Sequence, residues 1–367
     1  MKALFLYFGY FPEHSGVYKK IQSQIKSLER SGFETVLFGS QNEQGDMFIG
    51  DTIIGPRMSL RKIGQQVAFF TKIVTLINDY KISFIYYRFN GAANPYEYIF
   101  FSRLKKMGIK MVMEIPTYPY DGEIASKNGI YYLDKLCRIP MAKKFDYVVT
   151  FSDLARIFGQ KTINISNGID FNAVPLKNNI EVRSHELNLL GVANLTSWHG
   201  YDRIICGLSE YYNTANNDVK VKLHLVTGLE NDCVMELKQL VSRLKLERYV
   251  YFHGELHGKA LDKLFDEAQV AIGSLGRHRN NITQLKTLKN VEYAARGIPF
   301  IYSEINEDFD DASYVMRIKA DDSPVNIPSI IEFYQHIQAS PINIRASIAS
   351  LSWDNQIEKV VNKVFNR

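Results

Sequence analysis

Residues 270–302 read VAIGSLGRHRNNITQLKTLKNVEYAARGIPFIY. The stretch begins and ends with short apolar runs, 270–272 and 299–302, of the kind that form buried strands in a parallel sheet. Between them lies a loop with three cationic or titratable side chains, Arg277, His278 and Arg279, followed by a helical pattern over 284–296. Strand, loop, helix and strand in this order predict one βαβ unit of an α/β domain.

The same alternation extends in both directions along the 367 residues of the chain. Further strands are expected at 2–8, 35–38, 83–87, 110–114, 147–150, 162–165, 187–192, 220–226 and 250–252. A polar stretch, 171–185, interrupts the pattern and is the predicted linker. Because one hydrophobic core rarely serves so long a chain, we expect two Rossmann-like domains, 1–170 and 171–350, and a C-terminal helical segment, 351–367.

Net charge, cysteine spacing and the length of apolar runs limit the classes of function that the chain can have. The net charge of +5 is unevenly spread, with 22 Lys/Arg against 15 Asp/Glu in residues 1–170 and 22 against 24 in the remainder. This excess is modest and no recognition motif accompanies it, so nucleic-acid binding is not expected. The three cysteines show no metal-ligand spacing and indicate reduced thiols in a cytoplasmic protein. No apolar run reaches the length of a membrane span.

Loops that follow strands are the expected ligand sites, because open parallel sheets bind ligands beyond the carboxyl ends of their strands. The loop 9–16 ends at Gly16, where a predicted helix start would favour an anion. In the loop 193–200, Gly200 and the following helix start could hold a phosphate, with His199 and Arg203 as further donors. A plain βα turn is the alternative for the loop 9–16, and a structural role is the commoner one for a lone histidine such as His199.

The helical pattern after 284 carries the strongest signal. Gln284, Leu288 and Glu292 are predicted to share one face at spacings of four. A carboxylate such as Glu292 can accept hydrogen bonds from two ribose hydroxyls. Arg277 and Arg279 in the preceding loop, with Lys289 on the helix, would supply donors for a diphosphate.

These residues resemble the donor half of glycosyltransferase family 4, a retaining family of the GT-B fold. The similarity covers nearly the whole chain and rests on the segments 167–170 (NGID), 198–202 (WHGYD) and 292–299 (EYAARGIP). It implies two doubly wound domains facing a central cleft, with a C-terminal helix crossing back to the first domain. It also implies an acceptor-binding first domain and a donor-binding second domain.

Three positions depart from the family pattern. Gln284 stands where the family usually has its first glutamate, His199 where a phosphate-binding lysine is usual, and Ala193 where many members have an arginine. We therefore expect Arg277, Arg279, Arg203 and Lys289 to substitute in the phosphate clamp.

The resemblance implies transfer of a sugar from a nucleoside-diphosphate sugar to a hydroxyl of a glycan or polyprenyl-linked oligosaccharide, in bacterial capsule or exopolysaccharide synthesis. It implies no cofactor and no metal. Glu114, expected to face the cleft, and Asp121 are the general-base candidates of the first domain. A non-catalytic sugar-nucleotide-binding subunit and a sugar-nucleotide epimerase are the alternatives.

Basic side chains of the first half suggest peripheral contact with the inner face of the membrane. They are Lys19, Lys20, Lys26, Arg103, Lys105, Lys106 and Lys110.

Overall fold

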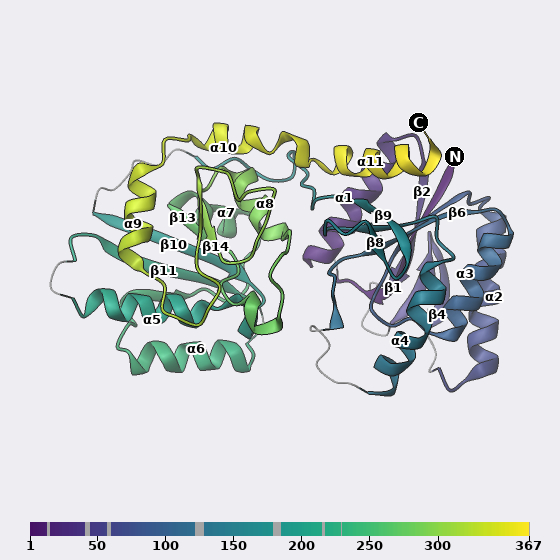
Figure 1. Cartoon of the computed structure of the whole chain (residues 1–367), viewed down its shortest axis with the longest axis horizontal. Helices are drawn as coiled ribbons and strands as arrows, with labels where there is room; N and C mark the ends of the chain where they lie inside the picture. The colour runs from purple at the N-terminus through teal and green to yellow at the C-terminus, as the bar shows by residue number, and fades with distance from the viewer. Residues whose placement is uncertain are drawn as a thin grey trace. The chain divides into compact units, whose positions relative to one another are not determined.

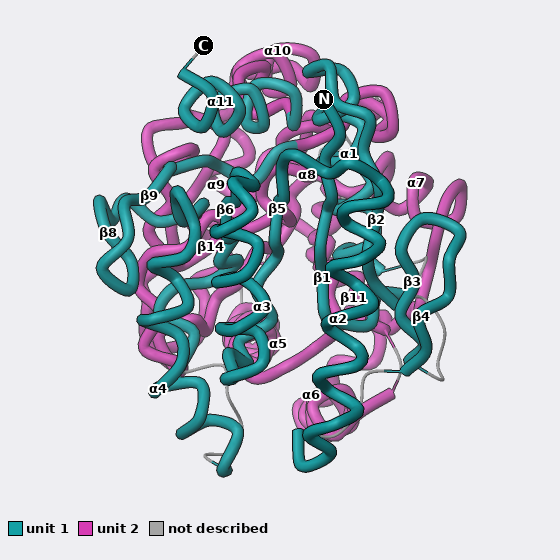
Figure 2. Tube along the Cα trace, turned by 90° about the vertical axis from the view of Figure 1, so that its right-hand side faces the viewer, with its two compact units in different colours: residues 1–168, 353–367 teal, residues 169–352 magenta. Residues whose placement is uncertain are grey.

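The computed structural model describes residues 1–12, 15–40, 45–56, 60–121, 128–178, 185–214, 217–228 and 230–366. The chain folds into two compact units, shown in different colours in Figure 2. Unit 1 contains Met1–Gly168 and Trp353–Arg367, and unit 2 contains Ile169–Ser352. The C-terminal helix therefore belongs to the same unit as the N-terminus.

Unit 1 is built on a mainly parallel sheet (Figure 1). The strand order in this sheet is β4-β3-β2-β1-β5-β6-β7-β9-β8. The strands are β1 (Lys2–Tyr10), β2 (Glu34–Ser40), β3 (Asp46–Ile49), β4 (Thr52–Pro56), β5 (Phe84–Arg88), β6 (Lys110–Ile115), β7 (Tyr147–Thr150), β8 (Arg156–Ile157) and β9 (Gln160–Asn164). Leu4 of β1 lies in register with Val36 of β2 and with Ile85 of β5. The strand order reverses here, so the loops after β1 and β5 diverge at this switch point.

The helices of unit 1 are α1 (Gly16–Arg30), α2 (Ile63–Asp79), α3 (Pro95–Lys106), α4 (Gly129–Ala142) and α11 (Trp353–Phe365). Helix α1 packs against α11, and α3 packs against both α2 and α4. Phe365 of α11 contacts Phe33 and Phe84, with ring centroids 5.6 and 5.5 Å apart. Aromatic packing thus holds the C-terminal helix on unit 1.

Unit 2 has a parallel sheet with the strand order β12-β11-β10-β13-β14-β15. The strands are β10 (Glu186–Ala193), β11 (Lys220–Thr227), β12 (Val250–Phe252), β13 (Val270–Ile272), β14 (Phe300–Tyr302) and β15 (Val315–Arg317). Strand β10 lies between β11 and β13, which makes the β10–β13 edge the switch point of this sheet.

Helices cover both faces of this second sheet. One core joins α5 (Tyr201–Tyr212), α6 (Asp232–Arg243) and α9 (Ile327–His336) to the strands. The other core contains residues of α7 (Gly258–Glu267), α8 (Leu288–Arg296) and α10 (Pro341–Ser347). Two 3-10 turns, η2 (Ser197–His199) and η3 (Arg277–Asn280), lie in the loops after β10 and β13.

The predicted βαβ alternation is present in both units, with four differences. The antiparallel β3–β4 hairpin, the short β8 and the strand β15 were not expected from the sequence. Helix α8 begins at Leu288 rather than at residue 284, because the Thr287 side chain caps it by accepting a hydrogen bond from the Asn290 N–H. Among the described residues, no helix is long and apolar enough to cross a bilayer.

Candidate functional site

The loops after β10 and β13 meet at the switch point of unit 2. The Leu275 and Gly276 N–H groups donate to the carbonyls of His199 and Trp198, at 2.9 and 3.2 Å. Gly200 has φ +66°, and a Cβ there would lie 2.7 Å from the backbone of Leu275 and Gly276. Gly200 is therefore required by close packing between the two loops as well as by its left-handed backbone.

His199 is held as a neutral hydrogen-bond donor. Its Nδ1 accepts a hydrogen bond from the Thr196 N–H at 3.1 Å, which places the ring proton on Nε2. Burial, reinforced by the charges of Lys289 and Arg277, lowers the pKa of His199 to about 2. The side chain supplies a fixed N–H without adding a charge.

Two cations lie beside His199. Lys289 stands in the first turn of α8, with its Nζ 3.4 Å from the Tyr201 hydroxyl. The Arg277 guanidinium lies 5.7 Å from the centre of the Trp198 ring. Burial and the nearby charge of Arg277 lower the pKa of Lys289 to about 7, with Glu304 acting in the opposite direction. Two cations and an N–H donor thus gather where the loops after β10 and β13 meet the first turn of α8, a suitable environment for a diphosphate.

Next to these cations lies a group of buried polar side chains that sequence reasoning missed. Ser274, Asn290 and Glu304 are each no more than 1% exposed. The Ser274 Oγ and both polar atoms of the Asn290 amide lack a hydrogen-bond partner among the described residues, and both Glu304 carboxylate oxygens lack one of regular geometry. Burial raises the pKa of Glu304 to about 7, although the backbone N–H groups of Glu304 and Ser303 and the charges of Arg277 and Lys289 act to lower it. Buried polar groups are nearly always satisfied in working proteins, so this cluster is suited to a hydroxyl-rich ligand or ordered water.

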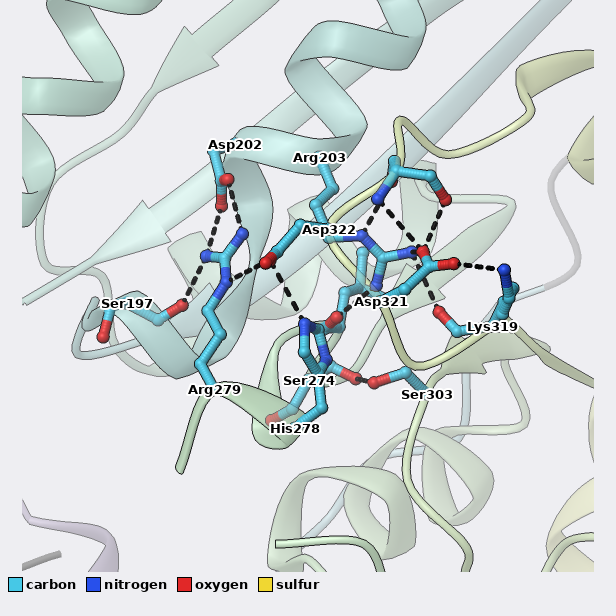
Figure 3. Close-up of polar contacts among 12 residues, drawn as sticks. Ser197, Asp202, Arg203, Ser274, His278, Arg279, Ser303, Lys319, Asp321 and Asp322 are labelled. Atoms are coloured by element: carbon cyan, nitrogen blue, oxygen red, sulfur yellow. Dashed lines mark hydrogen bonds and ion pairs between the residues drawn. The ribbon is translucent and has the colours of Figure 1, made fainter. Parts of the chain in front are cut away.

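The side chains of Arg203 and Arg279 bind other residues of unit 2 rather than facing an open site (Figure 3). Arg203 is 1% exposed, and its guanidinium donates to the carbonyls of Leu275, Lys319 and Ser323. Arg279 donates to both Asp202 oxygens, at 2.9 and 2.7 Å, and to Asp322. These contacts argue against the expectation that the two arginines replace the missing phosphate clamp.

The sequence predicted that Gln284, Leu288 and Glu292 share one helix face, but Gln284 lies outside the helix. Gln284 precedes α8 and donates to Glu307 at 3.0 Å, whereas Leu288 is the first residue of the helix. Glu292 lies one turn further on, where its Oε1 accepts a hydrogen bond from Arg296 at 3.2 Å. The Glu292 side chain remains 38% exposed, so its second oxygen is accessible to a ligand.

Unit 1 contains a separate pocket of about 290 Å³. It lies at the carboxyl ends of β1, β5 and β6, at the switch point of that sheet. Its lining includes Tyr7, Arg88, Phe89, Asn90, Thr117 and Tyr120. Tyr120 is fixed by donating its hydroxyl to Asp134 at 2.6 Å. The volume is close to the lower end of the range typical of small-molecule sites.

Glu114, expected to face the cleft as a general base, is buried and fully engaged. It is 0% exposed and accepts hydrogen bonds from Gln24 at 2.6 Å, Tyr86 at 2.7 Å and Arg88. Lys20 lies 3.2 Å away. Burial alone would raise the pKa of Glu114, but Lys20, Arg88 and the hydrogen bonds lower it to about 2. A carboxylate so stabilised and enclosed is poorly suited to accept a proton from a substrate.

In unit 1, Asp121 and Gly16 were also expected to take part in the ligand sites, and Lys20 was expected to contact a membrane. Asp121 is bound by Arg138, with the shortest contact at 2.8 Å. Gly16 is exposed, its backbone conformation does not require glycine, and Ser15 caps α1. Lys20 is 4% exposed and donates to Asn167 at 3.0 Å. It therefore cannot contact a membrane surface as the basic pattern suggested.

The acidic turn 308–311 is part of the packing of unit 2. Asp310 accepts a hydrogen bond from the Tyr302 hydroxyl at 2.7 Å, and Asp308 lies 3.4 Å from Lys286. In the part of the chain that the structure describes, no group of three His, Cys, Asp or Glu side chains could hold a metal ion.

Solved structures with a similar fold include glycosyltransferases. The alignment with HepE from Anabaena in complex with UDP covers 100% of both chains, with a TM-score of 0.71 and 17% sequence identity. Sucrose-phosphate synthase from Thermosynechococcus elongatus matches 100% of this chain and 99% of its own, with a TM-score of 0.68 and 14% identity. WaaG, a glycosyltransferase involved in lipopolysaccharide biosynthesis, matches 100% of both chains with a TM-score of 0.62 and 12% identity. No family model matches the sequence, and no curated protein does. The chain therefore has the GT-B fold expected from its sequence.

Proposed function

We propose that this protein is a glycosyltransferase that moves a sugar from a nucleoside-diphosphate sugar to an acceptor hydroxyl. The observation that carries the proposal is the arrangement in unit 2 of Arg277, Lys289 and the N–H donor of His199 at the switch point. HepE, which shares the fold, was crystallised with UDP and with UDP-glucose. A diphosphate is the ligand that such a set of donors would bind.

The reaction has a simple physical requirement. The bond between the anomeric carbon and the diphosphate oxygen breaks, a bond to the acceptor oxygen forms, and the acceptor hydroxyl gives its proton to a general base of unit 1 or to the departing diphosphate. Negative charge grows on the departing diphosphate. Arg277, Lys289 and the His199 Nε2–H would stabilise that charge electrostatically. No metal or other cofactor enters the proposal, which assigns this task to side chains.

The remaining donor contacts follow from the polar groups around the cations. The accessible oxygen of Glu292 would bind the ribose, with the first turn of α8 at Leu288 close to the nucleotide. Ser274, Asn290 and Glu304 would accept or donate hydrogen bonds to the hydroxyls of the transferred sugar. Glu304 would then supply a carboxylate that the family pattern places at position 284.

Unit 1 would bind the acceptor in its 290 Å³ pocket. Asp121 remains the general-base candidate from the sequence, and Glu114 becomes a positioning residue that holds Arg88 and Lys20. By the resemblance to family 4, we propose retention of anomeric configuration and hexosyl transfer in the cytoplasm. The acceptor would be a growing surface polysaccharide or polyprenyl-linked oligosaccharide, reached by peripheral contact with the inner membrane.

Calorimetry with UDP and UDP-glucose tests this proposal. The unchanged protein should bind both ligands and should slowly hydrolyse a sugar nucleotide that it accepts as donor. Glu292→Ala should greatly weaken nucleotide binding, whereas Glu255→Ala, an exposed carboxylate in the same unit, should not. Unchanged affinity in Glu292→Ala would remove that residue from the site.

A non-catalytic sugar-nucleotide-binding subunit is the second candidate, because Gln284 brings no charge and is bound by Glu307. Nucleotide binding without hydrolysis or transfer, across a panel of sugar nucleotides and acceptors, would favour it.

A further inference from the structure

From the unit 1 pocket we infer that the acceptor sugar is acidic: a hydroxylated ring bearing a carboxylate or phosphate group. This inference rests on the proposed function and specifies the chemical class of its acceptor. It is carried by the charge of the pocket lining, by the unused donors of Arg88, and by an unsatisfied acceptor on Asn90.

The charge of the lining is positive. Among the described residues that line the pocket, Arg88 is the one that carries a formal charge. Behind it, Glu114 is fully buried between Arg88 and Lys20, with Lys20 held away from the pocket by Asn167. Burial lowers the pKa of Lys20 to about 7, so near neutral pH this group of three carries a net charge between zero and +1, and the positive member of the group that lines the pocket is Arg88.

Arg88 retains hydrogen-bonding capacity toward a ligand. Within the described part of the chain, its guanidinium has one hydrogen-bond acceptor, Glu114, which engages Nη1. An arginine has five N–H donors in a planar fork that matches a carboxylate or phosphate. The Arg88 side chain is 10% exposed and lies 5.9 Å from the Tyr7 ring centre, measured from Cζ. It is thus oriented by its neighbours and partly accessible from the pocket.

Asn90 adds a requirement for hydroxyl groups. Its Nδ2 donates to the Phe8 carbonyl at 3.4 Å, which fixes the orientation of the amide. Its Oδ1 is buried and lacks a hydrogen-bond partner among the described residues. Because Oδ1 has almost no exposed surface, a ligand hydroxyl beside the anionic group would satisfy this oxygen after a small movement of the Asn90 side chain.

The remaining lining suits a sugar ring. Tyr7, Phe89 and Tyr120 contribute aromatic surface, and Phe89 packs edge-on against Tyr120 with ring centroids 5.6 Å apart. Apolar walls with a few placed polar groups are typical of specific small-molecule sites. An anion without a ring would leave these walls and the Asn90 oxygen unused.

The inference is tested by titrating the full chain with four probes, observed by ligand-detected NMR. The probes are methyl glucuronide, glucose 6-phosphate, methyl glucoside and inorganic phosphate, each measured with excess UDP present to occupy the donor site. At least one acidic sugar should bind about tenfold more tightly than the neutral glycoside, as expected for a charged hydrogen-bonded contact. The comparison between glucuronide and sugar phosphate distinguishes the two sources of charge.

Two variants test whether the preference for an acidic sugar arises at Arg88 and in the lining of this pocket. Arg88→Gln should abolish the preference for the acidic sugar, whereas Arg30→Gln, an exposed arginine paired with Asp354 in the same unit, should leave it unchanged. Because Arg88 also neutralises Glu114, Arg88→Gln could fail to fold. Asn90→Asp leaves that buried group intact, adds a negative charge to the lining, and should also erase the preference.

Equal binding of neutral and acidic sugars would overturn the inference, as would binding of inorganic phosphate as tight as that of the acidic sugars. Failure of the proposed function is distinguishable, because it appears as absent binding of UDP and UDP-glucose in titrations without acceptor probes. A protein that binds UDP-glucose but shows no acidic preference would retain the proposed function and lose this inference alone.

Discussion

Arg279 and Asp202 form a two-point ion pair, with N–O distances of 2.9 and 2.7 Å, that ties the loop after β13 to the first turn of α5. Arg203, the next residue along that helix, donates to the carbonyls of Leu275 and Ser323 and to that of Lys319, which is labelled in Figure 3. The two arginines shape the loops that carry His199 and Arg277. Their effect on a bound diphosphate would therefore be indirect.

Arg203→Ala should lower the free energy of unfolding by about 3 kcal/mol, because several buried carbonyls lose their donor. Urea unfolding measures this loss. The fraction that remains folded should bind UDP with near-normal affinity. Full stability combined with lost UDP binding would instead assign Arg203 to the phosphate site.

Glu304→Gln should stabilise the unliganded protein at pH 8. The pKa of Glu304 is raised to about 7 in the folded state from 4.5, so the native protein binds more protons than the unfolded chain between these values. Stability therefore falls as pH rises through this window, by up to about 3 kcal/mol. Glutamine has no charge to bury, so the variant should escape this loss.

Thermal unfolding at pH 5 and pH 8 measures the effect. The Tm difference between Glu304→Gln and the unchanged protein should be larger at pH 8, while the variant binds UDP normally and UDP-glucose more weakly. A variant that is less stable at pH 8 would show that the Glu304 carboxylate is satisfied within the protein.

Glu114→Gln should destabilise unit 1 by about 3–5 kcal/mol, since Lys20 and Arg88 would lose their buried counter-charge. Chemical denaturation is the measurement, and the double variant Lys20→Met/Glu114→Gln should recover part of the loss. If Glu114→Gln keeps normal stability and substrate binding but loses turnover, Glu114 is the general base that the sequence suggested.

Binding of UDP-glucose should weaken as pH rises from 6.5 to 8.5. Lys289 has a pKa of about 7 in the unliganded protein, and a bound diphosphate would raise it, so binding takes up a proton above pH 7. Calorimetry in buffers of different ionisation enthalpy detects that uptake. Lys289→Met should bind weakly and with a smaller pH dependence, the remainder coming from Glu304, whose pKa is also about 7; an unaltered pH profile in this variant would exclude Lys289 as the cause.

The fold was largely predictable because parallel strands buried on both faces give continuous apolar runs, as in β1 and β10. The β3–β4 hairpin was missed because these strands are short and carry a weaker pattern. The start of α8 depends on one cap, Thr287, within a segment whose spacing continues a helical pattern to residue 284.

The location of a candidate site residue was predictable where the residue follows a strand, as for His199 and Arg277, whose binding roles stay predictions. The role was not predictable where burial by distant segments decides it. Glu114 is neutralised by Lys20 from α1, and Glu304 is enclosed near Lys289 of α8 and Arg277. The spacing of residues along the sequence does not reveal contacts between segments that are far apart in the chain.

The central claim is that cations at the start of α8 and in the loop after β13 bind a nucleoside diphosphate. Calorimetric titration of UDP into the unchanged protein, Lys289→Met and the control Lys238→Met tests it most directly, since Lys238 is an exposed lysine of the same unit paired with Glu230. The account predicts a 10- to 100-fold loss of affinity, roughly the value of a charged hydrogen bond, for Lys289→Met and none for Lys238→Met. Absent UDP binding, or equal affinities in all three proteins, would contradict it.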